Sequence, residues 1–265
     1  MFNINDRLLE HFDESLNHFN VNNIVGLFVQ GSQNYGLETE YSDLDTKLII
    51  APSFKEVAMN QKPVSTTHIR ANEEHIDFKD IRLYIETFRK QNLNFLEILF
   101  TPYSIINPLY KQEWNRLVEA REKIARMNPR RAIQSMKGIA LEKYHAMEHP
   151  YPSKLDILAK WGYDPKQLHH LLRVEEYIGR YFDGEDYIDC LRPCHPEYLK
   201  SVKLGHYDLE EARIIANSAR ENVERMAEKA YQLYEDSEDA TALELLHDVQ
   251  YNIMKIAIGL EFKED

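Results

Sequence analysis

The sequence predicts an α+β fold, in which a mixed β-sheet with flanking helices forms the N-terminal part and helices alone form the C-terminal part. Short apolar or alternating runs, typical of strands, are confined to residues before about position 101. After Thr101-Pro102 and Asn107-Pro108, apolar residues recur at helical spacing over long segments. We therefore expect two domains, residues 1–104 and 105–265.

The N-terminal elements follow from periodicity. An amphipathic pattern predicts a helix over 6–19, and a β-branched apolar run predicts a buried strand over 24–30. The same criteria predict strands over 43–50, 64–70 and 74–80, and helices over 54–59 and 81–91. We expect the apolar segment 95–101 to close the sheet.

Helical patterns dominate the C-terminal part. They cover residues 109–126, 129–149, 165–181, 208–234 and 241–260. Asp164 followed by Pro165 is a favourable helix start, and Asp208 with Glu211 predicts a capping box. The least regular stretches are 150–163 and 183–206, and either can act as a lid or a substrate loop.

Gly31-Ser32, directly after the first predicted strand, indicates a phosphate-binding turn. A glycine lets the backbone approach a ligand closely, and the free N–H groups of a following short helix suit a triphosphate. Farther along, Asp43 and Asp45 alternate with apolar residues, so a strand would point both carboxylates to one face. Paired carboxylate oxygens suit Mg²⁺.

Asp77 is the predicted third carboxylate. In the strand around it, Ile76 and Phe78 face the core, which leaves Asp77 on the opposite face. Asp80 falls on the Ile76/Phe78 face, so we expect it to end the strand or to cap the following helix. Three carboxylates converging on divalent metal ions are what phosphoryl and nucleotidyl transfer require.

Together these residues resemble the nucleotidyltransferase superfamily that includes DNA polymerase β and kanamycin nucleotidyltransferase. The resemblance rests on Gly31-Ser32, the spacer, Asp43-Leu44-Asp45 and Asp77. It is closest to the bacterial and phage group described as predicted nucleotidyltransferases, through segments 92–100 and 162–166 together with His170 and Arg173. Asn92-Leu93 departs from the Asn-Pro usual in that group, which affects the expected turn but not the metal site.

The helix predicted after Asp164 presents two faces. Leu168, Leu171, Leu172 and Ile178 fall on the core side, whereas the other side carries Lys166, His169, His170, Arg173 and Tyr177. This second face either lines a nucleotide cleft or is an ordinary solvated surface. In the first case, Lys166 and Arg173 would bind phosphates and Tyr177 or His170 would lie near base or sugar. The resemblance favours this role for Lys166, His170 and Arg173.

Composition limits the classes of function. The chain has no apolar run long enough to span a membrane, and its N-terminus lacks signal-peptide features, so we expect a cytoplasmic protein. Cys190 and Cys194 lack the paired spacing of a zinc site, which favours reduced structural thiols. The net charge of −12 argues against wide, non-specific contact with nucleic acid.

One segment, 116–137, is locally basic. It is either a solvated helix surface or a local contact for an RNA end. Neither the oligomeric state nor the biological pathway can be predicted from this sequence.

These features predict a metal-dependent nucleotidyltransferase. Asp43, Asp45 and Asp77 would hold two Mg²⁺ or Mn²⁺ ions, and Gly31, Ser32, Lys166, His170 and Arg173 would bind an NTP such as ATP between the two domains. The reaction would move an NMP to an RNA end, a protein side chain or a small molecule and release pyrophosphate. The alternative is a catalytically silent module of the same fold for nucleotide sensing or protein contact.

Overall fold

The computed structural model describes residues 3–40 and 42–263, so Tyr41, in the predicted spacer, lies outside the described residues. The chain divides into two compact units. The sheet unit comprises Met1–Asn34, Glu40–Met127 and Glu238–Asp265, and the helical unit comprises Tyr35–Thr39 and Asn128–Ser237. Among the described residues, no helix combines the length and apolar character needed to cross a membrane.

A five-stranded mixed sheet in the order β3-β4-β2-β1-β5 forms the centre of the sheet unit. Its strands are β1 (Ile24–Gln30), β2 (Asp45–Ile50), β3 (Ser65–Ile69), β4 (His75–Asp80) and β5 (Ser104–Ile106). The pairing of β2 with β4 is parallel, whereas β1 with β2, β1 with β5 and β3 with β4 are antiparallel. Together with the helices, this sheet confirms the predicted α+β class.

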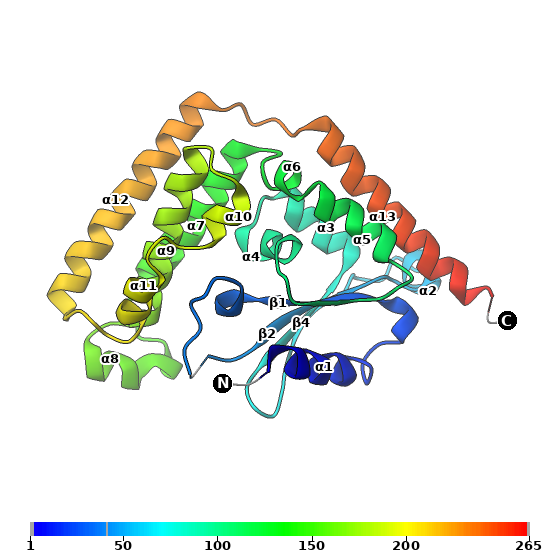
Figure 1. The fold of residues 1–265 in the computed structure, drawn as a ribbon, viewed down its shortest axis with the longest axis horizontal. Coiled ribbons are helices and arrows are strands. Elements are labelled where there is room, and N and C mark those ends of the chain that lie inside the picture. The colour runs from blue at the N-terminus through cyan, green and yellow to red at the C-terminus, as the bar shows by residue number, and fades with distance from the viewer. Residues whose placement is uncertain (1–2, 41, 264–265) are drawn as a thin grey trace. The chain divides into compact units, whose positions relative to one another are not determined.

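Alternation of side chains along each strand gives the sheet two faces, and helices pack on both. On one face, Leu8 of α1 (Ile4–Ser15) packs into a buried cluster that includes Leu48 and Ile76. Figure 1 shows α1 along this face and α3 (Ile81–Arg89) and α5 (Lys111–Glu119) beyond the other. Apolar contacts also build the second face, where the rings of Phe28 and Trp114 lie 4.4 Å apart.

The segment predicted to close the sheet, 95–101, is instead helical. Residues Leu93–Leu96 form α4 and Glu97–Leu99 form a 3₁₀ turn, η3. The side chain of Asn92 caps α4 by accepting from the backbone N–H of Asn94. The strand that closes the sheet is instead β5, later in the sequence. The prediction was wrong because residues 96–100 are all buried, so their pattern has no period that distinguishes a strand from a helix.

Several helices that follow the sheet in sequence belong to the sheet unit. They include α5, α6 (Arg121–Ala125) and α13 (Ala240–Glu261), so the predicted boundary after residue 104 does not coincide with the compact units. The long C-terminal helix α13 packs against α3 and α5. A single helix was predicted over 109–126, but helical geometry is interrupted at Ala120. The remaining helical elements of this unit are α2 (Phe54–Ala58), η1 (Val21–Asn23) and η2 (Gly31–Asn34).

The helical unit is built on three packed helices, α7 (Pro129–Ala146), α9 (Pro165–Phe182) and α12 (Leu209–Leu233). The predicted cap at Asp164 with Pro165 and the capping box of Asp208 with Glu211 are both present. The stretches predicted as irregular contain short helices: η4 (Pro152–Lys154), α8 (Leu155–Trp161), α10 (Tyr187–Leu191) and α11 (Pro196–Lys203). Cys190 and Cys194 are not joined by a disulfide bond.

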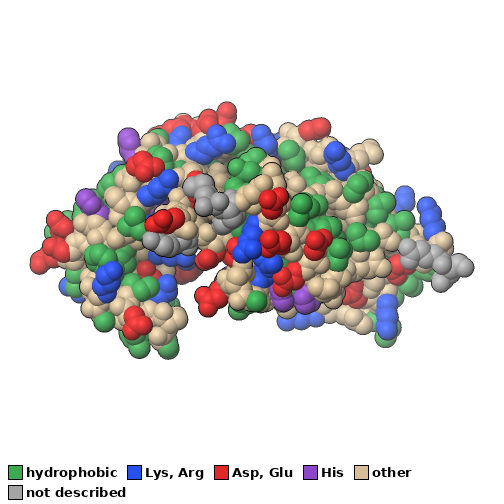
Figure 2. Space-filling model, turned by 60° about the horizontal axis from the view of Figure 1, so that its bottom comes forward, with side chains coloured by type: hydrophobic (Ala, Val, Ile, Leu, Met, Phe, Trp, Pro, Cys, Tyr) green, Lys and Arg blue, Asp and Glu red, His purple; other side chains and the backbone are tan. Residues whose placement is uncertain are grey.

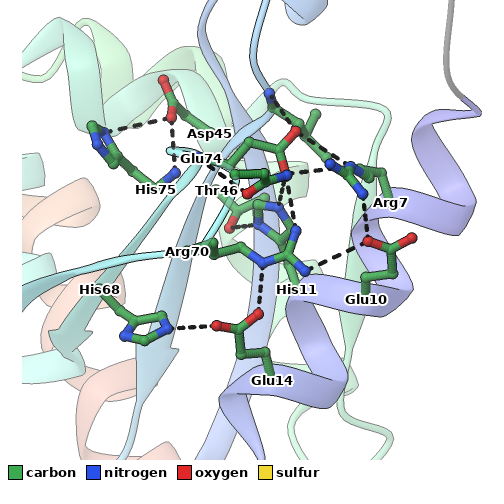
Figure 3. A network of polar contacts seen from close by, with 12 residues as sticks. Arg7, Glu10, His11, Glu14, Asp45, Thr46, His68, Arg70, Glu74 and His75 are labelled. Carbon is green, nitrogen blue, oxygen red and sulfur yellow. Dashed lines mark hydrogen bonds and ion pairs between the residues drawn. The ribbon is translucent and has the colours of Figure 1, made fainter.

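A buried polar network ties α1 to the sheet (Figure 3). The His11 ring lies between Thr46 Oγ1 and Glu74 Oε2, each 2.9 Å from a ring nitrogen. Glu74 also accepts from Arg70 at 2.9 Å and from Arg7 at 3.3 Å. Burial lowers the pKa of His11, so the neutral ring donates from Nε2 to Glu74 and accepts at Nδ1 from Thr46. Burial acts to raise the pKa of Glu74, but its hydrogen bonds and Arg7 outweigh this effect and lower it to about 2.

Glu74→Gln should destabilise the protein at pH 7 by about 3 kcal/mol, because it removes the charge that compensates Arg7 and Arg70. The pKa of Glu74 is about 2 when folded and 4.5 as a free group, so its contribution is complete above pH 4.5 and falls as the pH drops toward 2. Urea unfolding at pH 7 and about pH 3.5 tests both points. The control is Glu73→Gln, a substitution at the exposed residue next to Glu74. Equal stability of the two variants at pH 7 would contradict the assignment.

Candidate functional site

Gly31 ends β1 in a conformation that favours glycine. Its φ is +81°, although a Cβ there would meet no atom within 4 Å, so backbone conformation and not space requires the glycine. Its N–H donates to Glu97 Oε1 at 3.3 Å, and this buried carboxylate therefore positions the turn. The predicted short helix is the four-residue η2. Within it, the Ser32 hydroxyl has no hydrogen-bond partner among the described residues, which leaves it open to a ligand.

Asp43 and Asp45 lie where β2 begins. Asp43 is exposed just before the strand, and Asp45 is its first residue with a side chain 41% exposed. Asp45 Oδ1 accepts from the backbone N–H of His75 at 3.2 Å, and the His75 ring lies beside it (Figure 3). The backbone contact orients one oxygen of Asp45 and leaves a solvent-accessible carboxylate at the start of the central strand.

Asp77 lies on the same face, on the neighbouring strand β4, and is paired with Lys47 of β2. Lys47 Nζ donates to Asp77 Oδ2 at 3.1 Å, and Thr67 Oγ1 of β3 donates to Asp77 Oδ1 at 2.7 Å. Burial acts to raise the pKa of Asp77, but Lys47, Thr67 and Gln30 outweigh that effect and lower it. Asp77 is therefore held as a carboxylate by a buried ammonium, a contact that the sequence prediction did not include.

The donor set fits a divalent cation in part. Asp43 and Asp45 offer the hard oxygens that Mg²⁺ prefers. Asp77 lies two residues further along the parallel ladder than the partner of Asp45, and strand geometry puts their Cα atoms about 8 Å apart. In the described part of the chain, no three His, Cys, Asp or Glu side chains gather closely enough to hold a metal. Asp43 and Asp45 lie at the start of β2, and Asp77 is engaged by Lys47.

Phe95 of α4 covers this face because its segment is helical. Two ammonium groups lie over its ring in cation–π contacts, Lys47 Nζ at 4.4 Å and Lys79 Nζ at 4.1 Å from the ring centroid. It also meets the buried ring of Tyr84 edge-on, with centroids 5.5 Å apart. Alternation along β2 and β4 was the sequence signal that could place both lysines on this face. Nothing in the sequence pattern pointed to Phe95 as a residue of this site.

The predicted residues of α9 lie in the helical unit and differ in exposure. Lys166 is exposed, whereas His170 and Arg173 are partly buried. The Arg173 guanidinium lies 3.8 Å from the ring centroid of Tyr35, which belongs to the same unit. Burial, followed by the charges of His169, Arg173 and Lys166, lowers the pKa of His170 well below its ordinary value.

Two residues assigned to the polar face of α9 are instead buried. His169 Nδ1 donates to the carbonyl of Leu199 in α11 at 2.8 Å, and Tyr177 packs against Tyr187 of α10 with ring centroids 5.4 Å apart. Their helical positions agree with the prediction, but α10 and α11 cover them. The surface stripe predicted on α9 is therefore wrong for His169 and Tyr177.

Much of the locally basic segment is used in internal contacts. Arg116 pairs with Asp248 at 2.5 Å, Lys123 with Asp239 at 3.4 Å and Arg131 with Asp236 at 3.2 Å. On the face drawn in Figure 2, Lys and Arg side chains are scattered among acidic and apolar ones, without a broad basic surface. The contact with an RNA end stays a prediction.

Comparison with known proteins identifies no relative: no protein-family model matches the chain, and no curated protein matches it significantly. The functional interpretation therefore depends on the residues and geometry described above. Asp45, Lys47 and Asp77 share one face of the sheet unit, while Lys166, His170 and Arg173 share a helix of the helical unit.

Lys47→Met should raise the pKa of Asp77 toward its ordinary value of 3.8, because it removes the neighbouring positive charge. The Lys47–Asp77 interaction stabilises the fold above that pH and weakens as the pH falls below it. The carboxyl ¹³C resonance of Asp77, followed by NMR titration, measures the shift. Lys90→Gln is a control, because Lys90 pairs with Glu86. An unchanged Asp77 titration in Lys47→Met would refute this electrostatic assignment.

Proposed function

We propose that the protein is a metal-dependent nucleotidyltransferase that moves an NMP from an NTP to an acceptor and releases pyrophosphate. One observation carries the proposal. Asp45 and Asp77 lie on the same face of adjacent parallel strands, with Asp43 just before β2 and the Gly31 turn at the end of β1. Carboxylates in this arrangement suit chemistry at a phosphorus atom.

Asp43 and Asp45 are the proposed principal ligands of Mg²⁺ or Mn²⁺, with Asp77 as the third carboxylate. Bound divalent ions would neutralise the phosphates and favour ionisation of the attacking oxygen. Asp45 is oriented for this role by the backbone N–H of His75. The Ser32 hydroxyl and nearby backbone groups would contact the β- and γ-phosphates. In the helical unit, Lys166 and Arg173 would bind phosphate and His170 the base or sugar.

In the reaction, an acceptor oxygen attacks the α-phosphorus of the NTP. A new O–P bond forms as the bond between the α-phosphorus and the bridging oxygen breaks, and pyrophosphate leaves. Asp77 would take the proton of the acceptor hydroxyl. Lys47 and Thr67 hold Asp77 in place and keep it ionised until that proton arrives.

A silent nucleotide-binding module is the second candidate, and Lys47 is the observation that favours it. A buried ammonium beside Asp77 supplies positive charge where a catalytic site would use a metal ion. Under this alternative the protein binds nucleotide without producing pyrophosphate, so turnover separates the two functions.

Asp45→Asn should abolish label transfer from [α-³²P]NTP while the protein stays folded, because it removes a charged ligand. Wild-type protein, labelled NTP and cell extract are incubated, then separated into protein, RNA and small-molecule fractions. Asp13→Asn, an exposed change on α1, is the control and should transfer label normally. Transfer of the α-label, together with release of labelled pyrophosphate in a parallel incubation with [γ-³²P]NTP, supports the proposal. Near-normal transfer by a folded Asp45→Asn protein would sink it.

Arg173→Ala should weaken NTP binding about ten- to a hundredfold, because one charge-assisted phosphate contact is worth about 1.5–3 kcal/mol. Calorimetry measures the affinity, and thermal melting checks the fold because the variant also loses the Tyr35 contact. Arg225→Ala, at an exposed position of α12, is the control. Unchanged affinity in Arg173→Ala would assign Arg173 a structural role within the helical unit.

A further inference from the structure

A cavity of about 280 Å³ opens beside Asp77 on the face that carries Lys47. Its lining includes Ser65, Thr67, Lys79 and the Phe95 ring as well as Asp77. All of these residues belong to the sheet unit, and β3, which supplies Ser65 and Thr67, is an edge strand of the sheet. The cavity is thus reachable from the edge and bordered by the group proposed to accept a proton.

Lys79 gives the cavity a positive charge that the protein does not balance directly. Its ammonium lies over Phe95; Asp77 attracts it electrostatically, but in the described part of the chain no salt bridge joins it to a carboxylate. A ring face orients an ammonium without neutralising it, so its three N–H donors remain suited to an anionic oxygen. Asp77, the carboxylate of the lining, is already paired with Lys47.

We infer that this cavity is the acceptor site and that the acceptor is a small molecule with a hydroxyl beside Asp77 and a phosphate or carboxylate on Lys79. This inference rests on the proposed function. Small-molecule sites usually have volumes of about 300–1,000 Å³, so a cavity of about 280 Å³ suits a compact acceptor of sugar-phosphate size. Ser65 offers a further hydroxyl, which has no partner among the described residues.

The acceptor would react through its hydroxyl while its anionic group stays on Lys79. Its O–H bond breaks as the oxygen bonds to the α-phosphorus of the NTP, the proton passes to Asp77, and pyrophosphate leaves. Lys79 takes no part in these bond changes. It is a binding residue for the acceptor, so its substitution should raise the acceptor KM more than it lowers kcat.

The first test measures binding without nucleotide or metal. Ribose 5-phosphate is titrated against the full chain and followed by NMR, with ribose as the uncharged probe and inorganic phosphate as the free anion. We expect ribose 5-phosphate to shift resonances of Thr67 and Lys79, to bind more tightly than inorganic phosphate, and ribose not to bind. Lys79→Gln should weaken binding about tenfold, whereas Lys79→Arg should retain it. The control Lys55→Gln, at an exposed position of α2, should also retain it.

Failure of this inference and failure of the proposed function are distinguishable. If the wild-type protein does not bind ribose 5-phosphate but does transfer the α-label, the acceptor site alone would be overturned. Equal binding of ribose 5-phosphate by wild type and folded Lys79→Gln would also overturn it. An RNA oligonucleotide that shifts Thr67 and Lys79 when the small anions do not would assign the cavity to a macromolecular acceptor and refute the small-molecule inference. Absence of label transfer by wild-type protein would count against the proposed function, whatever the cavity binds.

Discussion

Parallel pairing between β2 and β4 is the constraint on which the rest of the structure depends. It places Lys47 opposite Asp77 and Thr46 opposite Ile76, so each strand contributes to both faces at a fixed register. A shift by one residue would exchange the faces and bury the charged set against α1. The carboxylates of the proposed site and the apolar core beneath them are therefore two consequences of one ladder.

The two faces use buried charge differently. On the α1 face, His11, Glu74 and Arg70 form a network whose members satisfy one another, and its evident role is to hold helix and sheet together. On the opposite face, Lys47 satisfies Asp77, but Lys79 contacts only an aromatic ring among the groups that border the cavity. Unequal charge compensation is expected where a ligand completes the interactions. This difference directs the functional interpretation to the second face.

Alternation in the sequence was sufficient to assign Asp45 and Asp77 to a common face and Asp80 to a helix cap, because strand period and capping are local properties. Register is not local, so the Lys47–Asp77 contact could not be derived. Residues 95–101 were misassigned because 96–100 are all buried, so this run has no polar side to reveal its period. His169 and Tyr177 have the predicted helical positions, but their burial depends on α10 and α11, which were predicted as irregular chain.

The most direct measurement of the central claim is a crystal structure with Mn²⁺ and a non-hydrolysable NTP analogue, using the anomalous signal of manganese to locate the ion. The account predicts an anomalous peak at the carboxylates of Asp43 and Asp45, with the α-phosphate on the face of the sheet that carries Lys47 and Asp77. A fully occupied nucleotide whose phosphates and manganese lie away from Asp43 and Asp45 would contradict it.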